Sequence, residues 1–134
     1  MLYDAIIIGG GPAGLTLGSE LSKKHNILLI EKGEIGNTTK RWTTEKMIIK
    51  KAGLERFISA EFKKSAFRSV NQFFYFKLNL VSIDERKILL YFKNNISKNK
   101  SKVLENCSFI NHKITEIVKV KTSRGNFESR LLID

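Results

Sequence analysis

Two apolar runs near the start of the chain predict buried parallel strands. Residues 2–8 are apolar with one exception, and residues 27–30 read ILLI. Runs without polar alternation are typical of strands that are covered on both faces of a sheet. The stretch AGLTLGSELSKK between them places Leu15, Leu17 and Leu21 on or near one face of a helix. The pattern therefore predicts a β-α-β unit at the start of the chain.

The middle of the chain departs from this pattern. The stretch TTEKMIIKKAGLERFI predicts a short helix with a Thr cap, Glu45 in its first turn and Gly53 at its end. From Phe73 onward apolar and polar residues alternate, which predicts a half-buried strand. The segment SIDER is expected to turn the chain, which places Asp84 and Glu85 in a hairpin turn, and KILLYF is expected to return as the second strand.

The last third of the chain again reads as α/β structure. The segment NKSKVLENC predicts a short helix, although its Asn and Ser content weakens it. Apolar positions then alternate, with a turn at Arg124, Gly125 and Asn126 and a closing apolar strand. These alternating positions predict strands on both sides of the turn.

Four of the nine glycines lie between residues 9 and 14, directly after the first predicted strand. The sequence GGGPAG matches G-x-G-x-x-G, the loop that binds the pyrophosphate of a dinucleotide. Gly9 would permit the tight turn, Gly11 would leave room for the phosphates, and Gly14 would let the helix pack closely on the sheet. Pro12 suits the first turn of a helix, whose free N–H groups face the phosphates. A glycine turn without a ligand also fits the motif alone, so its context decides.

The context of the motif favours a dinucleotide site. The second predicted strand leads into Glu31, which lies seventeen residues beyond Gly14. A β-α-β unit presents a carboxylate near this position to the ribose hydroxyls of the dinucleotide. A carboxylate also repels a 2′-phosphate, which disfavours NADP at this site. These residues do not separate FAD from NAD, because both present an ADP half to the same loop.

Composition and charge change this picture little. The chain has 134 residues, is 42% hydrophobic and carries a net charge of +11. Its basic residues are dispersed, without a zinc-finger spacing or an aromatic RNA-binding signature, so we interpret them as a solvated surface and expect no specific nucleic-acid partner. A functional anion patch is the alternative. Peripheral contact with an anionic membrane is a hypothesis that the charge allows.

The sequence names no catalytic residue and no metal site. Cys107 is the single cysteine, forms no internal disulfide, has no Cys or His beside it at metal-ligand spacing, and is expected to be buried. His25 and His112 lack the neighbours of a catalytic triad, and Asp84 and Glu85 are interpreted as turn residues. Neither an apolar stretch of about eighteen residues nor a secretory leader is present, which predicts a cytoplasmic location.

The stretch YDAIIIGGGPAGLTLGSELSKKHNILLIEK resembles the amino-terminal FAD-binding signature of one flavoprotein group. That group includes geranylgeranyl reductases, lycopene cyclases and aromatic-ring hydroxylases of the para-hydroxybenzoate hydroxylase type. The resemblance implies an α/β, Rossmann-type FAD/NAD(P)-binding fold with a parallel sheet, plus an antiparallel β-hairpin insertion. We place the Rossmann core at residues 1–40 and 103–134, and the helix and hairpin insertion at residues 41–102. FAD is the implied cofactor, with NAD(P)H as an external electron donor.

The resemblance also assigns cofactor-binding residues. The glycine loop would bind the pyrophosphate, and Glu31 would bind the adenosine ribose. Lys32 would flank the adenine, and the backbone of Ile114 would meet it. Arg41 would lie near the flavin or its phosphates, or be one more surface arginine. The full predicted set is Gly9, Gly10, Gly11, Pro12, Ala13, Gly14, Glu31, Lys32, Arg41 and Ile114.

The hairpin region of the resembled group contributes to a sheet that faces the substrate. Its counterparts here would line an apolar pocket or, as we favour, pack in an ordinary sheet core. These residues are Phe73, Phe74, Tyr75 and Phe76. The chain ends at Asp134, before the Gly-Asp element that contacts the ribityl chain, and it lacks the Arg-x-x-Phe-Asp wording. It therefore resembles the amino-terminal third or so of a usual member, as a fragment or as a reduced protein.

The resemblance implies an FAD-dependent oxidoreductase, in which the isoalloxazine carries out the redox chemistry. We expect a reductase that acts on an apolar, isoprenoid-like small molecule. The alternatives are an FAD-dependent aromatic hydroxylase or monooxygenase, a non-catalytic nucleotide-binding fragment, and a basic scaffold whose glycine turn is vestigial.

Overall fold

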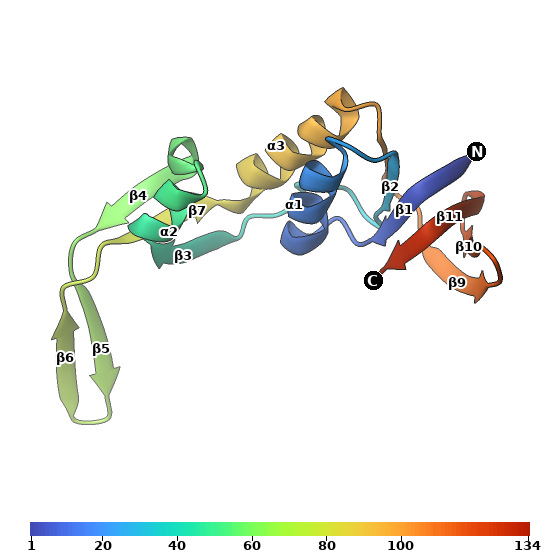
Figure 1. The fold of residues 1–134 in the computed structure, drawn as a ribbon. Coiled ribbons are helices and arrows are strands. Elements are labelled where there is room, and N and C mark those ends of the chain that lie inside the picture. The colour runs from blue at the N-terminus through green and yellow to red at the C-terminus, as the bar shows by residue number, and fades with distance from the viewer. The chain divides into compact units, whose positions relative to one another are not determined.

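The structure is a computed structural model that describes residues 1–134. The chain forms two compact units, of which the first comprises residues 1–37 and 89–134 and the second comprises residues 38–88. Figure 1 shows the helices and strands of each unit in chain order.

The first unit is built on a six-stranded sheet with the strand order β8-β2-β1-β11-β10-β9. Its strands are β1 (Leu2–Ile8), β2 (Ile27–Ile30), β8 (Lys102–Leu104), β9 (Phe109–Ile114), β10 (Val118–Thr122) and β11 (Gly125–Ile133). β1 pairs in parallel with β2 and β11, β2 pairs in parallel with β8, and β9, β10 and β11 form an antiparallel meander. The predicted α/β, Rossmann-type fold is confirmed.

The core of the first unit lies on both faces of the central strands. All four side chains of β2 are buried, as its continuous apolar run predicts. One cluster of buried side chains comprises Tyr3, Ile6, Leu28, Ile30, Leu104, Cys107, Val118 and Val120. On the other face, helix α1 (Pro12–Leu21) follows β1 and brings Gly18 close to Ile7, Ile27 and Ile96. Cys107 is fully buried, as predicted.

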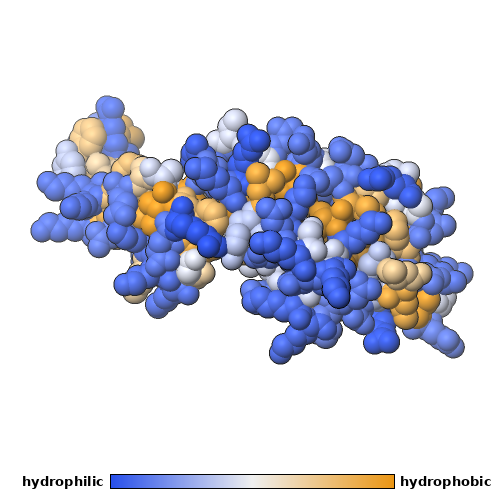
Figure 2. All heavy atoms as spheres, turned by 90° about the horizontal axis from the view of Figure 1, so that it is seen from above, coloured by the Kyte–Doolittle hydropathy of each residue, from blue (hydrophilic) through white to orange (hydrophobic).

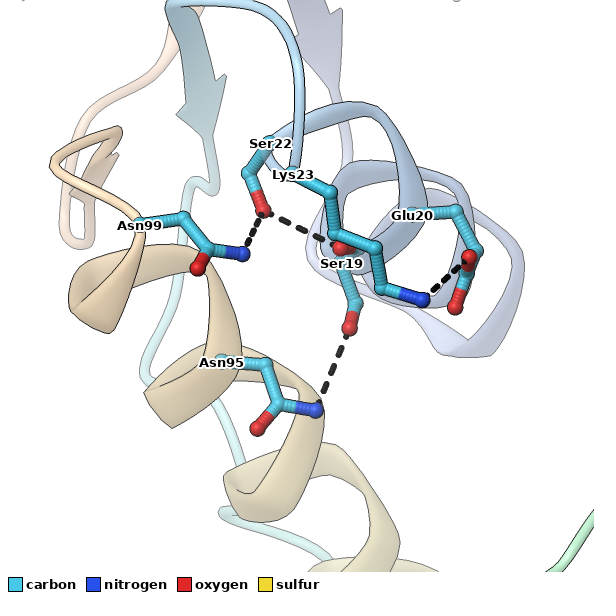
Figure 3. A network of polar contacts seen from close by, with 6 residues as sticks. All are labelled: Ser19, Glu20, Ser22, Lys23, Asn95 and Asn99. Atoms are coloured by element: carbon cyan, nitrogen blue, oxygen red, sulfur yellow. Dashed lines mark hydrogen bonds and ion pairs between the residues drawn. The ribbon is translucent and has the colours of Figure 1, made fainter.

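Helix α3 (Glu85–Lys98) is joined to the end of α1 by paired polar side chains (Figure 3). The amide Nδ2 of Asn95 donates to Ser19 Oγ at 3.2 Å, and Nδ2 of Asn99 donates to Ser22 Oγ at 3.0 Å. Both serines are buried away from water, and these bonds give their hydroxyl groups hydrogen-bond partners within the protein. The bonds fix α3 along α1.

The second unit is largely antiparallel. Its elements are β3 (Arg41–Glu45), α2 (Lys46–Lys51), the short 3₁₀ helix η1 (Glu55–Phe57), β4 (Ile58–Phe62), β5 (Ser65–Ser69), β6 (Gln72–Phe76) and β7 (Leu80–Asp84). One sheet has the order β3-β7-β4, and β5 and β6 form a separate two-stranded ribbon. The side chains of Val81 and Ile83 on β7 are fully buried at the centre of the three-stranded sheet.

The hairpin expected from SIDER and KILLYF is wrong. Asp84 ends β7, and Glu85 begins α3, which contains all of KILLYF. Ile88, Phe92 and Ile96 are buried at a spacing of four residues, which is the spacing of one helix face. Lys87 N–H donates to Asp84 Oδ1 at 3.4 Å, so Asp84 caps the helix.

Two further local predictions are corrected. The segment NKSKVLENC contains strand β8 instead of a helix, because residues 102–104 pair with β2. Helix α2 begins after Glu45 without a side-chain cap, since Thr43 and Thr44 belong to β3. Gly53 follows the end of this helix with a φ of +65°, which agrees with its predicted role as a stop.

The predicted grouping of apolar side chains is wrong at two places. Leu17 is exposed on α1, where Leu15, Gly18 and Ser19 are the buried residues. The aromatic residues predicted to pack in a sheet core lie on β6, and every residue of this strand is exposed. The ribbon has only two strands, so no second layer covers them.

Hydrophilic side chains cover most of the face seen in Figure 2, and hydrophobic residues reach the surface in patches. None of the helices combines the length and the apolar character needed to cross a membrane.

Candidate functional site

The glycine loop joins β1 to α1 at the carboxyl end of β1. Gly9 has a φ of +104°, a backbone conformation that residues with a side chain rarely adopt. Its N–H donates to the carbonyl of Ile30 at 2.8 Å. Helix α1 then begins with Gly11 as N-cap and Pro12 in the first position. The loop is therefore anchored to β2, and the first amides of the helix have no partner within the helix.

The first turn of α1 is suited to an anion. Gly11 has no side chain to cap the helix, and the turn contains no acidic residue, so its amides keep their partial positive charge. A Cβ atom placed on Gly11 would have no atom within 4 Å. Open space in front of uncapped amides is the geometry that binds phosphate at helix starts.

The carboxylate of Glu31 holds two loops together at the end of β2. Its Oε2 atom accepts from Gly10 N–H at 2.6 Å, and its Oε1 atom accepts from Gly33 N–H at 2.8 Å. A carboxylate offers about four acceptor positions, so two of them are left for a ligand. Glu31 thus organises the glycine loop in addition to the ribose role that its spacing predicts.

A cavity of about 270 Å³ opens beside this carboxylate, at the carboxyl ends of the parallel strands. Its lining combines apolar and polar residues: Ile8, Gly9, Ile30, Glu31, Lys32, Cys107, Ser108, Phe109 and Asp134. Small-molecule sites in proteins measure about 300–1,000 Å³, so this cavity suits one part of a dinucleotide, such as a nucleoside. In folds of this kind ligands bind outside the carboxyl ends of the strands.

The structure brings together most of the predicted site residues. Gly9, Glu31 and Lys32 line the cavity, and Gly10 donates to Glu31. The rest of the glycine loop continues into α1 and is not part of the cavity lining. Ile114 does not line the cavity. Phe109 begins β9 and lines the cavity, whereas Ile114 ends this strand and is 70% exposed. Arg41 belongs to the second unit, where its Nη1 atom lies 2.9 Å from Asp84 Oδ2. The cofactor roles of all these residues stay predictions.

The far wall of the cavity was not predicted. Cys107, Ser108 and Phe109 follow β8, and Cys107 N–H donates to the Glu31 carbonyl at 2.9 Å. These residues lie more than seventy positions from Glu31 in the sequence. No local motif marks them, and only the pairing of β8 with β2 brings them to the site.

Glu105 lies between β8 and this wall in the sequence and binds two residues from elsewhere in the first unit. Its Oε1 atom accepts from Ile35 N–H at 2.7 Å, and its Oε2 atom forms an ion pair with Lys93. Burial raises the pKa of Glu105, but the hydrogen bonds from Lys93 and Ile35 together with the charge of Lys93 outweigh it, and the pKa is lowered overall. The carboxylate is therefore stabilised in its charged form.

We expect Glu105→Gln to reduce the free energy of unfolding by about 1–2 kcal/mol at neutral pH, because a partly buried charged hydrogen bond is lost. A lowered folded-state pKa stabilises the fold above the unfolded value of 4.5, and this contribution is lost as the pH falls through the folded value. Urea titrations of both proteins at neutral pH and at about pH 3 should show the difference shrinking in acid.

The matched control is Glu20→Gln, which removes the exposed ion pair with Lys23. It should change the free energy of unfolding by about 0.5 kcal/mol or less. An equal effect of the two substitutions, or a Glu105 effect that persists unchanged in acid, would contradict the role given to Glu105.

Solved structures share this fold. A geranylgeranyl bacteriochlorophyll reductase-like protein from Thermoplasma acidophilum aligns over 97% of this chain and 37% of its own, with a TM-score of 0.76 and 19% identity. The p-nitrophenol 4-monooxygenase PnpA from Pseudomonas putida DLL-E4 aligns over 98% of this chain and 40% of its own, with a TM-score of 0.80 and 12% identity. At these identities the likeness shows the fold alone.

Halogenase PltM in complex with phloroglucinol and FAD gives a TM-score of 0.75 at 16% identity, over 98% of this chain and 34% of its own. The chain thus spans between a third and two fifths of the length of these three structures. No curated protein sequence matches it.

The family comparison agrees with the fold. A family model described as pyridine nucleotide-disulphide oxidoreductase matches residues 6–133, which is nearly the whole chain. The predicted flavoprotein relationship is confirmed at this level, and the chain belongs to this family of FAD-dependent oxidoreductases.

Proposed function

We propose that this chain binds FAD through its ADP half, as the dinucleotide-binding part of an oxidoreductase that acts on an apolar small molecule. One observation carries the proposal: the open space at Gly11 and the cavity at Glu31 lie along the same loop. Gly9 lines the cavity and Gly10 donates to Glu31, so the phosphate loop adjoins the cavity.

Each part of ADP finds a chemically suitable part of this surface. The pyrophosphate would be bound by the amides of the first turn of α1, which are already oriented and need no reorganisation. The ribose hydroxyls would donate to the free acceptor positions of Glu31. The adenine would enter the cavity, where Ile30 and Phe109 supply apolar contacts and Ser108 supplies polar ones.

The bound FAD would supply the redox chemistry through its isoalloxazine ring. The residues of this chain orient the cofactor and exclude a 2′-phosphate. Cys107 is its single cysteine and is fully buried, so this chain supplies no pair of redox-active cysteines. The flavin is the redox group in this proposal, with NAD(P)H as an external electron donor.

We favour a reductase that acts on an apolar, isoprenoid-like substrate. A reductase-like protein is among the structural neighbours, and the second unit of this chain exposes aromatic side chains. An aromatic hydroxylase is the second candidate, because a p-nitrophenol monooxygenase shares the fold as well. A non-catalytic nucleotide module is the third candidate, because the cavity and the glycine loop would bind only the ADP half of FAD.

The proposal is tested by the absorbance spectrum of the purified protein and by titrations with FAD and with ADP. Flavin bands in the purified protein, or saturable FAD binding tighter than ADP binding, would support the oxidoreductase. Equal affinities for ADP and FAD would favour the nucleotide module. Binding of neither would overturn the proposal.

Glu31 gives a further expected result. ADP should bind at least about tenfold more tightly than 2′-phospho-ADP, because the carboxylate would stand opposite the added phosphate. Isothermal titration of the two nucleotides measures this ratio. Glu31→Gln, checked for folding by circular dichroism, should reduce the ratio toward one, and an unchanged ratio in this variant would contradict the ribose role.

A further inference from the structure

The second unit contains an exposed segment that combines aromatic and basic side chains. Residues 62–77 include six aromatic and four basic residues and no acidic residue. The aromatic ones are Phe62, Phe67, Phe73, Phe74, Tyr75 and Phe76. All six are more than two fifths exposed, and β5 and β6, which carry most of them, form the two-stranded ribbon. We call residues 62–77 the aromatic ribbon.

Both faces of the ribbon carry aromatic side chains. Phe67 lies opposite Phe74 on one face, and the neighbouring pair, in which Arg68 lies opposite Phe73, points to the other face. On that second face the rings of Phe73 and Tyr75 stack with centroids 6.4 Å apart, and the guanidinium of Arg68 lies 5.5 Å from the Phe73 ring. A two-stranded ribbon is marginally stable in water, so a surface that buries these rings would stabilise it.

Basic residues stand at the base of the ribbon. Lys63 and Lys64 precede β5, and Lys77 follows β6. Lys77 also lines a hollow of about 390 Å³, together with Lys46, Lys50, the exposed Met47 and one acidic residue, Glu45. The three lysines make this hollow basic overall. Lys46 is paired with Glu61 at 2.8 Å, whereas Lys50 and Lys77 have no ion-pair partner.

We propose that the aromatic ribbon and the adjacent basic hollow bind the surface of an anionic phospholipid bilayer. Aromatic rings are favoured at the boundary between headgroups and acyl chains, and lysines beside them meet anionic headgroups. Charge complementarity supports this occupant, since residues 38–88 hold twelve Lys and Arg against five Asp and Glu.

A single-stranded nucleic acid is the other polyanion that aromatic and basic residues can bind. The exposed aliphatic residues of this unit favour the bilayer. Val70 at the tip of the ribbon is 89% exposed, and Met47 and Ile48 are each more than half exposed. Aliphatic side chains gain from contact with acyl chains but offer no ring for base stacking.

The test is flotation of the full chain with phosphatidylcholine vesicles, with and without phosphatidylglycerol. Binding should require phosphatidylglycerol and should weaken with added salt. Lys63→Gln with Lys64→Gln should weaken the partition constant about 25-fold, at about fivefold for each lysine. Phe74→Ser with Tyr75→Ser, one change on each face, should weaken it about tenfold or more.

The matched controls lie on the first unit. Lys113→Gln with Lys121→Gln removes two exposed lysines, and Ile110→Ser with Leu131→Ser removes two exposed apolar side chains. Both should bind vesicles within about twofold of the wild type. Circular dichroism checks that each variant is folded.

A second measurement does not depend on variants that lose binding. Phe74→Trp in a Trp42→Phe background places the single tryptophan on the ribbon, and its emission should shift to the blue with anionic vesicles. No shift, or equal binding by ribbon and control variants, would overturn the proposal. If vesicles are not bound, binding of a single-stranded RNA oligonucleotide would also overturn it. The same holds for a dimer that the ribbon variants dissociate. FAD titration of the same proteins is independent, because the ribbon contributes no residue to the cavity.

Discussion

Valine at position 11 is expected to weaken FAD binding at least about 100-fold while leaving the chain folded. The physical reason is that Gly11 borders open space instead of protein: no atom lies within 4 Å of a Cβ placed there. Its φ of −78° and ψ of −177° are ordinary extended values, which valine adopts readily. The isopropyl group would then occupy the space in which the pyrophosphate must approach the amides.

The stability of this variant shows whether FAD binding is lost because the valine blocks the phosphates or because the chain is unfolded. Valine is a poorer helix cap than glycine, so Gly11→Val should reduce the free energy of unfolding by about 1 kcal/mol or less. FAD titration and urea denaturation of the same sample measure both effects. Thr16→Val, on the exposed face of α1, adds a valine outside the loop and should leave FAD binding unchanged. Wild-type affinity in Gly11→Val would show that the phosphates do not use this loop.

The part of the site that could be predicted is the part that is local in sequence. The glycine loop and Glu31 belong to one β-α-β unit, in which strand, turn and helix fix the spacing between loop and acid. Apolar runs that are bounded by the glycine loop and by Glu31 indicate β1 and β2, and no polar side chain interrupts β2. The structure accordingly places Gly10 and Glu31 in direct contact.

The rest of the cavity depends on contacts that are distant in sequence. Phe109 and Cys107 reach the site because β8 pairs with β2, and β8 is only three residues long. Such a short strand has too few residues to show a period, so the pattern around it was misread as a helix. Ile35 and Glu105 are joined across seventy residues, a contact that no local spacing indicates.

Helix α3 and the ribbon show two other limits of a periodic pattern. The apolar run at the start of α3 fits a strand as well as a helix. The helix is recognised from the buried residues Ile88, Phe92 and Ile96, which are spaced by four positions with polar residues between them. At Phe73 and Phe74 the strand was predicted correctly, but its burial was not. Alternation indicates a strand, whereas burial depends on whether another layer covers it.

Alanine at position 14 is expected to destabilise the first unit by about 3 kcal/mol or more, although alanine is normally favoured over glycine in a helix by about 1 kcal/mol. A Cβ atom on Gly14 would lie 2.1 Å from the carbonyl oxygen of Gly9, which is backbone and is held by the bond from Gly9 N–H to Ile30. Urea denaturation measures the change.

Gly18→Ala in the same helix is the control, because there the nearest atom, at 2.9 Å, is the flexible end of the Ile96 side chain. The control should stay within about 1 kcal/mol of the wild type, since propensity offsets the contact. If Gly14→Ala were as stable as Gly18→Ala, the close approach of helix and loop at the phosphate site would be contradicted.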